Sequence, residues 1–362
     1  MLPLRPRVLI VFAVLFLAAP VRADSFDHAG LAKQVLEQHI RPGYANLEEK
    51  AKALHGRTVA FCSGDSSKDI ERLRDAFRDM VFAWSAVSHI RFGPVMDEHR
   101  HPRMLYWPDR KGLGFRQIRQ ALRNKSKSVT SLNSLTEKSV ALQGLSAIEL
   151  LLYWDVETQL LAPGERRTHR CGYLTAASEN LAMIANAVVN GWAPGADFTA
   201  IFLEPGKDNP RYLEPSEVTL EIVKAFVVGL ERLRDIKVAG PLGLRPNNPA
   251  RVVVPFEPSK LSMRAIQAEL EGLIDLFEKG GLKSRIEKQE SGMGDAISLD
   301  LAQALKSFER IQLPIKEAAK NTEAENELIA TGFPLKNARE QATRVLSEAA
   351  GLSMGFNALD GD

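Results

Sequence analysis

The stretch IERLRDAFRDMVFAWSAVSHIRFGP, residues 70–94, indicates the fold class of this chain. Its apolar side chains recur every three or four positions, which is the spacing of one buried face of a helix. These residues are Ile70, Leu73, Phe77, Met80, Val81, Trp84, Val87 and Ile90. Ser66 and Asp69 resemble a helix-capping box before the stretch, and Gly93-Pro94 ends the pattern. The stretch therefore predicts a long amphipathic helix that buries one face against other helices.

The same periodicity recurs along most of the remaining chain. It predicts helices over about 136–152, 172–191, 215–240 and 261–279, then over 298–330 with an interruption at Pro314, and over 335–350. Few segments alternate with the period of two that is typical of strands. Residues 251–254 are interpreted as an extended linker for that reason. The chain is therefore predicted to be all-α.

The domain organisation follows from length and from one irregular segment. The chain has 362 residues, 45% of them hydrophobic and 25% charged, which is a globular composition that excludes wholesale disorder. A guide of roughly 150 residues per domain suggests two domains. Glycine and proline crowd the segment between Gly191 and Ser216 and break the helical pattern. We expect two up-and-down helical bundle domains packed together, one over residues 24–200 and one over residues 201–362.

The first 23 residues have the pattern of a signal peptide. Arg5 and Arg7 precede an apolar run over residues 8–19, and Val21-Arg22-Ala23 supplies small residues at a cleavage site. The run is shorter than the roughly 20 residues that span a membrane, and no later stretch is long and apolar enough. Cleavage predicts a mature chain that starts at Asp24, has no transmembrane segment and is periplasmic or otherwise exported. The alternative is an uncleaved N-terminal anchor.

Charge and cysteine content limit the possible functions. Removing Arg5, Arg7 and Arg22 changes the formal charge from +2 to −1, so the mature chain lacks the basic excess of a nucleic-acid-binding protein. Cys62 and Cys171 are the two cysteines. An exported compartment permits a disulfide between them, and two buried free thiols are the alternative.

The segment QGLSAIELLLY, residues 143–153, carries the most informative polar residues. Gly144 is unfavourable inside a helix by roughly 0.8–1 kcal/mol, and close approach of another backbone or a ligand is one reason to tolerate it. Ser146 and Glu149 share one helix face. A carboxylate among leucine and isoleucine must be paired, protonated or functional. Pairing with an arginine that joins two helices is the structural alternative to a functional role.

Several motifs, taken in order, resemble the imelysin family. Gly144-x-Ser146-x-x-Glu149 is similar to the family's Gly-x-His-x-x-Glu motif, with Ser146 in the histidine position. Further similar segments are Trp84 to Pro94, Trp107-Pro108-Asp109, Glu257 to Arg264, and Gly355 to Asp362. The resemblance covers nearly the whole mature chain.

This resemblance implies both a fold and a site. Imelysin-like proteins are all-helical proteins of two bundle domains, exported by bacteria and in many cases linked to iron uptake. The founding member was described as an insulin-cleaving membrane metallopeptidase. The family's site surrounds the motif helix near the contact between domains. Applied to this chain, the resemblance implies that the ligand-binding residues are Gly144, Ser146 and Glu149, with Trp84, Arg91, Trp107 and Asp109 as neighbours.

The serine at position 146 argues against peptidase chemistry. A histidine and a glutamate three residues apart can share a metal, but a serine hydroxyl is a poor zinc ligand. The chain also lacks His-Glu-x-x-His, and Ser146 lacks the second glycine of a nucleophile elbow. Iron or zinc remains a possible cofactor. Glu149, His99 and His101 are the weak candidate ligands, and a polar loop is the alternative for residues 97–101.

The leading functional prediction is a non-enzymatic binding or accessory protein of the cell envelope, linked to iron or other metal uptake. Envelope proteins of an iron-uptake system would be its partners. The alternatives are an imelysin-type metallopeptidase with a non-standard metal site and a docking partner of an outer-membrane receptor. We also expect the Glu149 carboxylate to pair with a buried arginine, with Arg91 the first choice.

Overall fold

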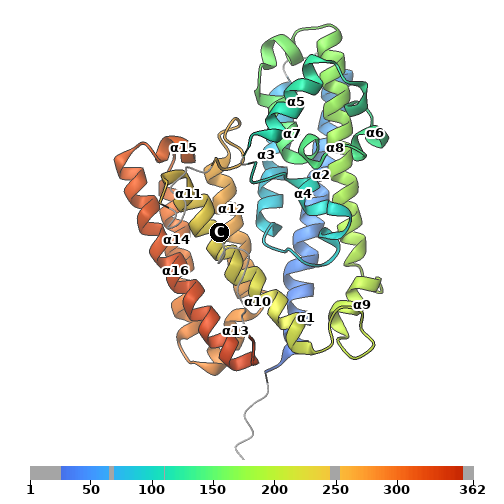
Figure 1. Ribbon diagram of the computed structural model, residues 1–362. Coiled ribbons are helices and arrows are strands. Elements are labelled where there is room, and N and C mark those ends of the chain that lie inside the picture. Colours follow the sequence, from blue (N-terminus) through green and yellow to red (C-terminus); the bar gives the residue numbers. More distant parts are fainter. Residues whose placement is uncertain (1–25, 65–68, 110, 245–252, 354–362) are drawn as a thin grey trace, which may run out of the picture.

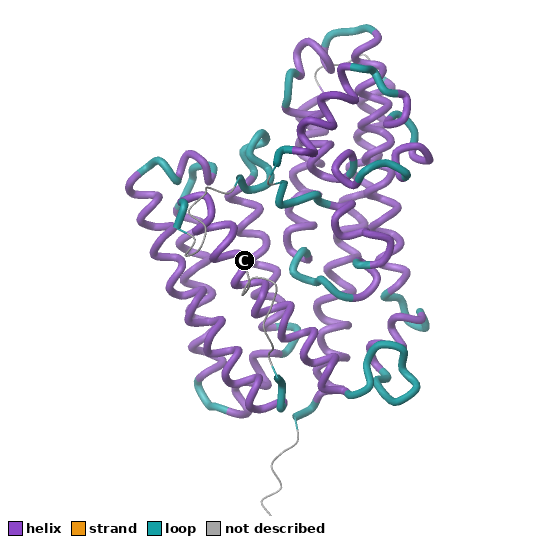
Figure 2. Tube along the Cα trace, in the orientation of Figure 1, coloured by secondary structure: helices purple, strands orange, loops and turns teal. Residues whose placement is uncertain are grey.

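The computed structural model describes residues 26–64, 69–109, 111–244 and 253–353. Every regular element in these ranges is helical, so the predicted all-α fold class is confirmed (Figures 1 and 2). None of the helices in these ranges is long and apolar enough to cross a membrane. The expected signal peptide at 1–23 and the C-terminal motif at 355–362 lie outside the described residues.

The first group of helices is built around three long ones that pack side by side (Figure 1). These are α2 (Arg41–Ser63), α3 (Ile70–Val87) and α8 (Glu165–Gly191). Shorter helices cover this core: α4 (Arg100–Met104), α5 (Leu113–Arg123), α6 (Leu132–Thr136) and α7 (Gly144–Tyr153). A disulfide joins Cys62 of α2 to Cys171 of α8, with the two Cα atoms 5.5 Å apart.

The second group contains the helices from α10 to the end of the described chain. They are α10 (Pro215–Glu231), α11 (Ala239–Leu242), α12 (Ser262–Glu278), α13 (Leu282–Gln289), α14 (Met293–Arg310), α15 (Ile315–Ala318) and α16 (Thr322–Ala350). The π-helical segment η8 (Arg232–Val238) joins α10 to α11 without a break. In Figure 1 this group, coloured yellow to red, lies beside the first.

Shorter elements connect and border the two groups. Helix α1 (His28–Val35) packs against α10 and continues through the π-helical η1 (Leu36–Ile40) into α2. Helix α9 (Asp197–Leu203) lies in the connection between α8 and α10. The remaining short turns are η3 (Gly93–Val95), η4 (Asp97–His99), η5 (Lys127–Val129), η6 (Val140–Leu142) and η7 (Glu157–Leu161). The division at residues 200 and 201 stays a prediction.

The two groups meet where α3 packs against α12. A Cβ atom at Gly272 of α12 would lie 1.9 Å from the carbonyl oxygen of Ala86, so glycine is what allows this close backbone approach. The buried apolar residues of both groups form one continuous cluster. Any cavity between the groups is therefore held in place by packed helices on both sides.

Several helix boundaries differ from the sequence expectation, and three of them bear on the packing or on the motif. Helix α16 runs unbroken from Thr322 to Ala350 with Pro334 buried inside it, where two separate helices were predicted. The free energy gained by packing along the whole helix outweighs the free energy lost with the hydrogen bond that proline cannot make. Helix α8 starts at Glu165, before the expected start near residue 172. Helix α7 starts at Gly144 rather than near residue 136, so this glycine lies at the first turn of the helix.

Candidate functional site

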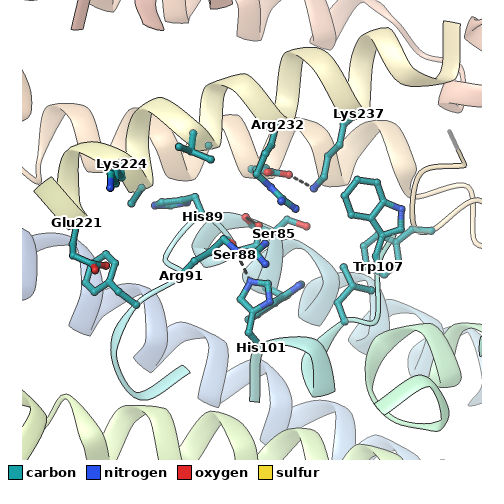
Figure 3. Close-up of a pocket in the computed structure, with 18 residues that line it drawn as sticks. Ser85, Ser88, His89, Arg91, His101, Trp107, Glu221, Lys224, Arg232 and Lys237 are labelled. Atoms are coloured by element: carbon teal, nitrogen blue, oxygen red, sulfur yellow. Dashed lines mark hydrogen bonds and ion pairs between the residues drawn. The ribbon is translucent and has the colours of Figure 1, made fainter. Parts of the chain in front are cut away.

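A cavity of about 210 Å³ lies between the two groups of helices. One wall comes from the end of α3 and the chain that follows it, and the other comes from α10, η8, α12 and the turn before α12 (Figure 3). Aromatic surface is provided by Trp84, Phe92, Trp107 and Phe256. The volume is many times the roughly 10–15 Å³ that one water molecule needs. The cavity therefore has room for a small molecule.

Four cationic side chains line this cavity: Arg91, Lys224, Arg232 and Lys237. Lys237 forms a buried ion pair with Glu269 of α12, which neutralises both charges. The other three cations have no ion-pair partner within the described ranges. The cavity consequently carries an excess of positive charge.

Burial lowers the pKa values of the two arginines that line the cavity. The pKa of Arg91 falls to about 10, because the charge of Arg232 adds to the effect of partial burial and that of Glu269 opposes it, although Arg91 remains exposed to solvent. Burial also lowers the pKa of Arg232. Arginine stays protonated in proteins, so both guanidinium groups are charged at neutral pH. Figure 3 shows the Arg232 side chain extending from η8 toward the wall that holds Ser85 and Ser88.

His101 lies on the same wall and is buried against Trp84, with the ring centroids 5.0 Å apart. Its Nε2 donates a hydrogen bond to the backbone carbonyl of Ser88 at 3.2 Å. Burial, and after it the charge of Arg91, lowers the pKa of His101 to about 3. The imidazole is therefore neutral, and the nitrogen facing Ser88 already has a partner.

A chain of hydrogen bonds reaches the cavity from the second group of helices. Asp275 of α12 accepts from Nδ1 of His39 at 2.7 Å, and Nε2 of His39 lies 3.0 Å from Nε2 of His89. Both histidines are buried, and His89 lines the cavity. Its Nδ1 is buried without a hydrogen-bond partner among the described residues. Burial, and after it the charge of His39, lowers the pKa of His89 well below the ordinary value.

Glu149 lies next to this site but does not line the cavity. It is 5% exposed on α7, and its Oε1 accepts hydrogen bonds from the backbone N–H of Ser259 at 3.0 Å and from the Ser259 hydroxyl at 2.6 Å. The expected ion pair with Arg91 is therefore wrong. The turn before α12 supplies the donors that compensate the buried carboxylate, while Arg91 interacts with Arg232 and Glu269 instead.

The Glu149 carboxyl is nevertheless strongly perturbed. Burial raises its pKa to about 7, although the hydrogen bonds from Ser259 favour the ionised form. The negative charge of Glu257 adds to the increase. Glu149 therefore changes protonation state near neutral pH rather than near pH 4.5.

Two side chains of the first group hold the turn that precedes α12. Trp107 Nε1 donates to the carbonyl of Val253 at 3.0 Å, and Glu149 accepts from Ser259. Phe256 lies between these two attachment points and forms part of the cavity wall. It has a positive φ of 69°, a conformation that a bulky residue adopts only when its surroundings impose it. Glu149 is thus placed to position the cavity wall.

The remaining residues of the motif have structural contacts. Gly144 has a φ of +72°, and a Cβ atom there would lie 2.3 Å from the carbonyl oxygen of Arg103. The expected close approach is thus made by the backbone of α4. Ser146 is half-buried on α7 and does not line the cavity. Asp109 accepts from the backbone N–H groups of Leu113 and Gly114, at 2.7 and 2.9 Å, and so caps α5 away from the cavity.

Comparison with known proteins agrees with this arrangement of helices. A family profile described as Imelysin matches residues 40–344. The chain belongs to the imelysin family. The resemblance read from the motifs is thereby confirmed over most of the chain.

Three relatives illustrate the family. Iron-regulated protein A from Synechococcus elongatus is 23% identical over 211 residues, which is 57% of this chain and 53% of that protein. The chain therefore spans about half the length of this curated relative. An imelysin-like protein from Psychrobacter arcticum 273-4 has a TM-score of 0.72 at 19% identity, covering 91% of this chain and 97% of that one. A chain from Parabacteroides distasonis described as an iron-regulated protein A precursor has a TM-score of 0.70 at 14% identity, covering 88% and 94%. The two structural likenesses concern the fold.

The candidate ligands do not come together as a metal site in the described part of the chain. Within those ranges, no three His, Cys, Asp or Glu side chains are grouped so that they could hold a metal ion. Glu149 is hydrogen-bonded to Ser259, His101 lies among cations, and His99 is on an exposed turn. A catalytic zinc needs three protein ligands and an open position, which these residues do not supply.

The sequence identified part of this site and missed the rest. Of the predicted residues, the structure brings Trp84, Arg91, Trp107 and His101 around the cavity. The residues that sequence reasoning missed are Arg232, Lys237, Glu269, His89, His39 and Asp275. His39 and Arg232 lie in π-helical segments, which the 3.6-residue periodicity does not reveal. Such segments are frequent at functional sites, but they leave no clear sequence signal.

Proposed function

We propose that this imelysin is an exported binding or accessory protein of the cell envelope that works in iron or other metal uptake. The observation that carries the proposal is the cavity between the two groups of helices, with aromatic walls and three cations that lack ion-pair partners in the described chain. A concave site with apolar walls and a few convergent polar groups is the usual form of a small-molecule site. The relatives named iron-regulated protein A support the link to iron.

Two features support binding in preference to peptide hydrolysis. Ser146 offers no nitrogen ligand, and it lies in the first turn of α7, which no strand precedes in the described chain. The cavity also carries a positive charge, which opposes a free divalent cation. We expect the chain to use this site for recognition of a ligand.

The proposed export is supported by the covalent chemistry of the first group of helices. The disulfide between Cys62 and Cys171 closes a loop of 109 residues and suits an oxidising compartment. We expect the periplasmic fraction to contain a chain that begins at Asp24. Finding the intact N-terminus on most molecules would contradict the proposed export.

A cavity-filling variant tests the proposed function. Val228 of α10 lines the cavity, so Val228→Trp should fill it, whereas Val59→Trp adds the same bulk at an exposed position of α2. We expect a strain lacking the protein to grow more slowly under iron limitation. Wild-type protein and Val59→Trp should restore growth, and Val228→Trp should fail to do so.

The result is interpretable once folding has been checked. Far-ultraviolet circular dichroism and the amount of protein in the periplasmic fraction should be the same for both tryptophan variants. Full restoration of growth by a folded, exported Val228→Trp protein would overturn the proposal. So would normal growth of the deletion strain under iron limitation.

A further inference from the structure

We infer that the cavity binds a small organic oxyanion, a carboxylate or phosphate ester, between the guanidinium groups of Arg91 and Arg232. The inference rests on the proposed function and names the class of ligand. Neither guanidinium forms an ion pair within the described ranges, and the one carboxylate that attracts both of them, Glu269, is already paired with Lys237.

The positive charge of the cavity favours an anion. The carboxylates that line it are already used, because Glu269 pairs with Lys237 and Glu221 lies 3.6 Å from Arg211. The positive charges of Arg91 and Arg232 repel each other, and an anion between them lowers the electrostatic free energy of both. The planar fork of a guanidinium matches a carboxylate or phosphate through two parallel hydrogen bonds. A bound oxyanion would therefore compensate the positive charge of these two guanidinium groups.

Two buried nitrogen atoms of the cavity wall also favour a ligand, independently of the charge. Nε1 of Trp84 and Nδ1 of His89 are both buried without a hydrogen-bond partner, and both residues line the cavity. Trp84 is 1% exposed and His89 is 4% exposed. Buried polar atoms are rarely left unpaired, so such atoms at a cavity wall point to a ligand. The Trp84 N–H is a further donor that suits an anion.

The hydrogen-bond chain leaves one ring nitrogen of His89 for a ligand. Nδ1 of His39 donates to the carboxylate of Asp275, and Nε2 of His39 and Nε2 of His89 share a hydrogen bond. Nδ1 of His89 is therefore the ring nitrogen that a polar group of the ligand would bind.

The cavity walls and volume restrict the ligand further. Trp107 and Phe256 present apolar surface, and a space of about 210 Å³ excludes a folded polypeptide segment. A bare metal cation would meet an excess of positive charge. A small organic anion with a few carbon atoms fits the charge, the walls and the volume together.

Calorimetric titration of the mature protein tests the inference with defined probes. Citrate is the carboxylate probe, glycerol 3-phosphate is the phosphate-ester probe, and glycerol is the neutral probe. We expect saturable one-to-one binding of at least one anion and none of glycerol. Arg91→Gln and Arg232→Gln should each weaken binding by about tenfold or more, the effect of losing a charged hydrogen bond.

A matched control removes an arginine elsewhere. Arg344 pairs with Glu290 on an exposed surface, so Arg344→Gln should bind the anion as wild type does. Arg91→Lys keeps the charge but not the planar fork, and it should bind between wild type and Arg91→Gln. Equal binding by all variants, or no binding of either anion at millimolar concentration, would overturn the inference.

The outcomes separate this inference from the proposed function. If neither anion binds but Val228→Trp still fails to restore growth, the site is functional and the ligand class is wrong. If an anion binds as expected but Val228→Trp restores growth, the ligand class stands and the role in iron-limited growth fails.

Discussion

Replacing Glu149 by glutamine should change the pH dependence of stability. The glutamine amide oxygen can still accept the two hydrogen bonds from Ser259, but the side chain no longer titrates. Burial raises the pKa of Glu149 to about 7, so the folded protein holds this proton more tightly than the unfolded chain does. The favourable contribution of the protonated carboxyl is therefore fully present below about pH 4.5 and is lost as the pH rises through about 7.

The magnitude follows from these two pKa values. A tenfold change in proton affinity corresponds to about 1.4 kcal/mol, so the difference between 4.5 and about 7 corresponds to about 3 kcal/mol. We expect the free energy of unfolding of Glu149→Gln, relative to wild type, to increase by about this amount between about pH 4.5 and about pH 8. Glu149→Ala should be less stable than Glu149→Gln throughout by about 1–3 kcal/mol, because the Ser259 N–H loses its acceptor.

Urea unfolding followed by circular dichroism at several pH values measures this effect. Glu323→Gln, at an exposed position of α16, is the control for removing one negative charge. A stability difference between wild type and Glu149→Gln that stays constant across the pH range would refute the reasoning. It would mean that the Glu149 carboxyl titrates as an ordinary glutamate.

Three further substitutions have defined effects on stability, and thermal and urea unfolding measure each of them. Gly144→Ala should destabilise the protein by about 2 kcal/mol or more, because φ is positive and a Cβ atom would collide with the backbone of α4; an unchanged melting temperature would contradict this. Cys62→Ser with Cys171→Ser should cost about 2–5 kcal/mol, and wild type treated with reductant should behave alike. Asp109→Ala should cost about 0.5–2 kcal/mol through loss of the cap on α5, and Asp109→Asn should cost less because its amide oxygen still accepts.

The helices could be predicted where amphipathic periodicity is strong and its ends are marked. Helix α3 begins at Ile70, as its apolar stripe indicates, and α12 covers Ser262–Glu278 against an expected 261–279. The prediction failed where tertiary packing outweighs a local signal. Pro334 breaks the pattern in the sequence, yet α16 continues through it because both of its halves pack against the same group.

The site could be predicted only in part, for a related reason. Of the residues that the motifs indicated, Arg91, Trp84 and Trp107 line the cavity between the two groups, and their role in binding stays a prediction. The partner of Glu149 could not be foreseen, since Ser259 is separated from it by 110 residues and its backbone N–H carries no sequence signal. Arg232 could not be identified from the sequence because the helix changes to π-helical geometry at that residue, next to its apolar stripe.

The contacts of Glu149 show how the turn before α12 is held without the side chain of Ser146. Glu149 accepts two hydrogen bonds from Ser259, across the junction of the two groups, and neither involves Ser146. A backbone hydrogen bond from Phe256, a residue of the cavity wall, also favours the ionised carboxylate. We therefore expect a substitution at position 146 to leave the attachment of this turn in place, whereas Glu149→Ala removes it. A change at the cavity wall after Ser146→Ala that matches the change after Glu149→Ala would contradict this reasoning.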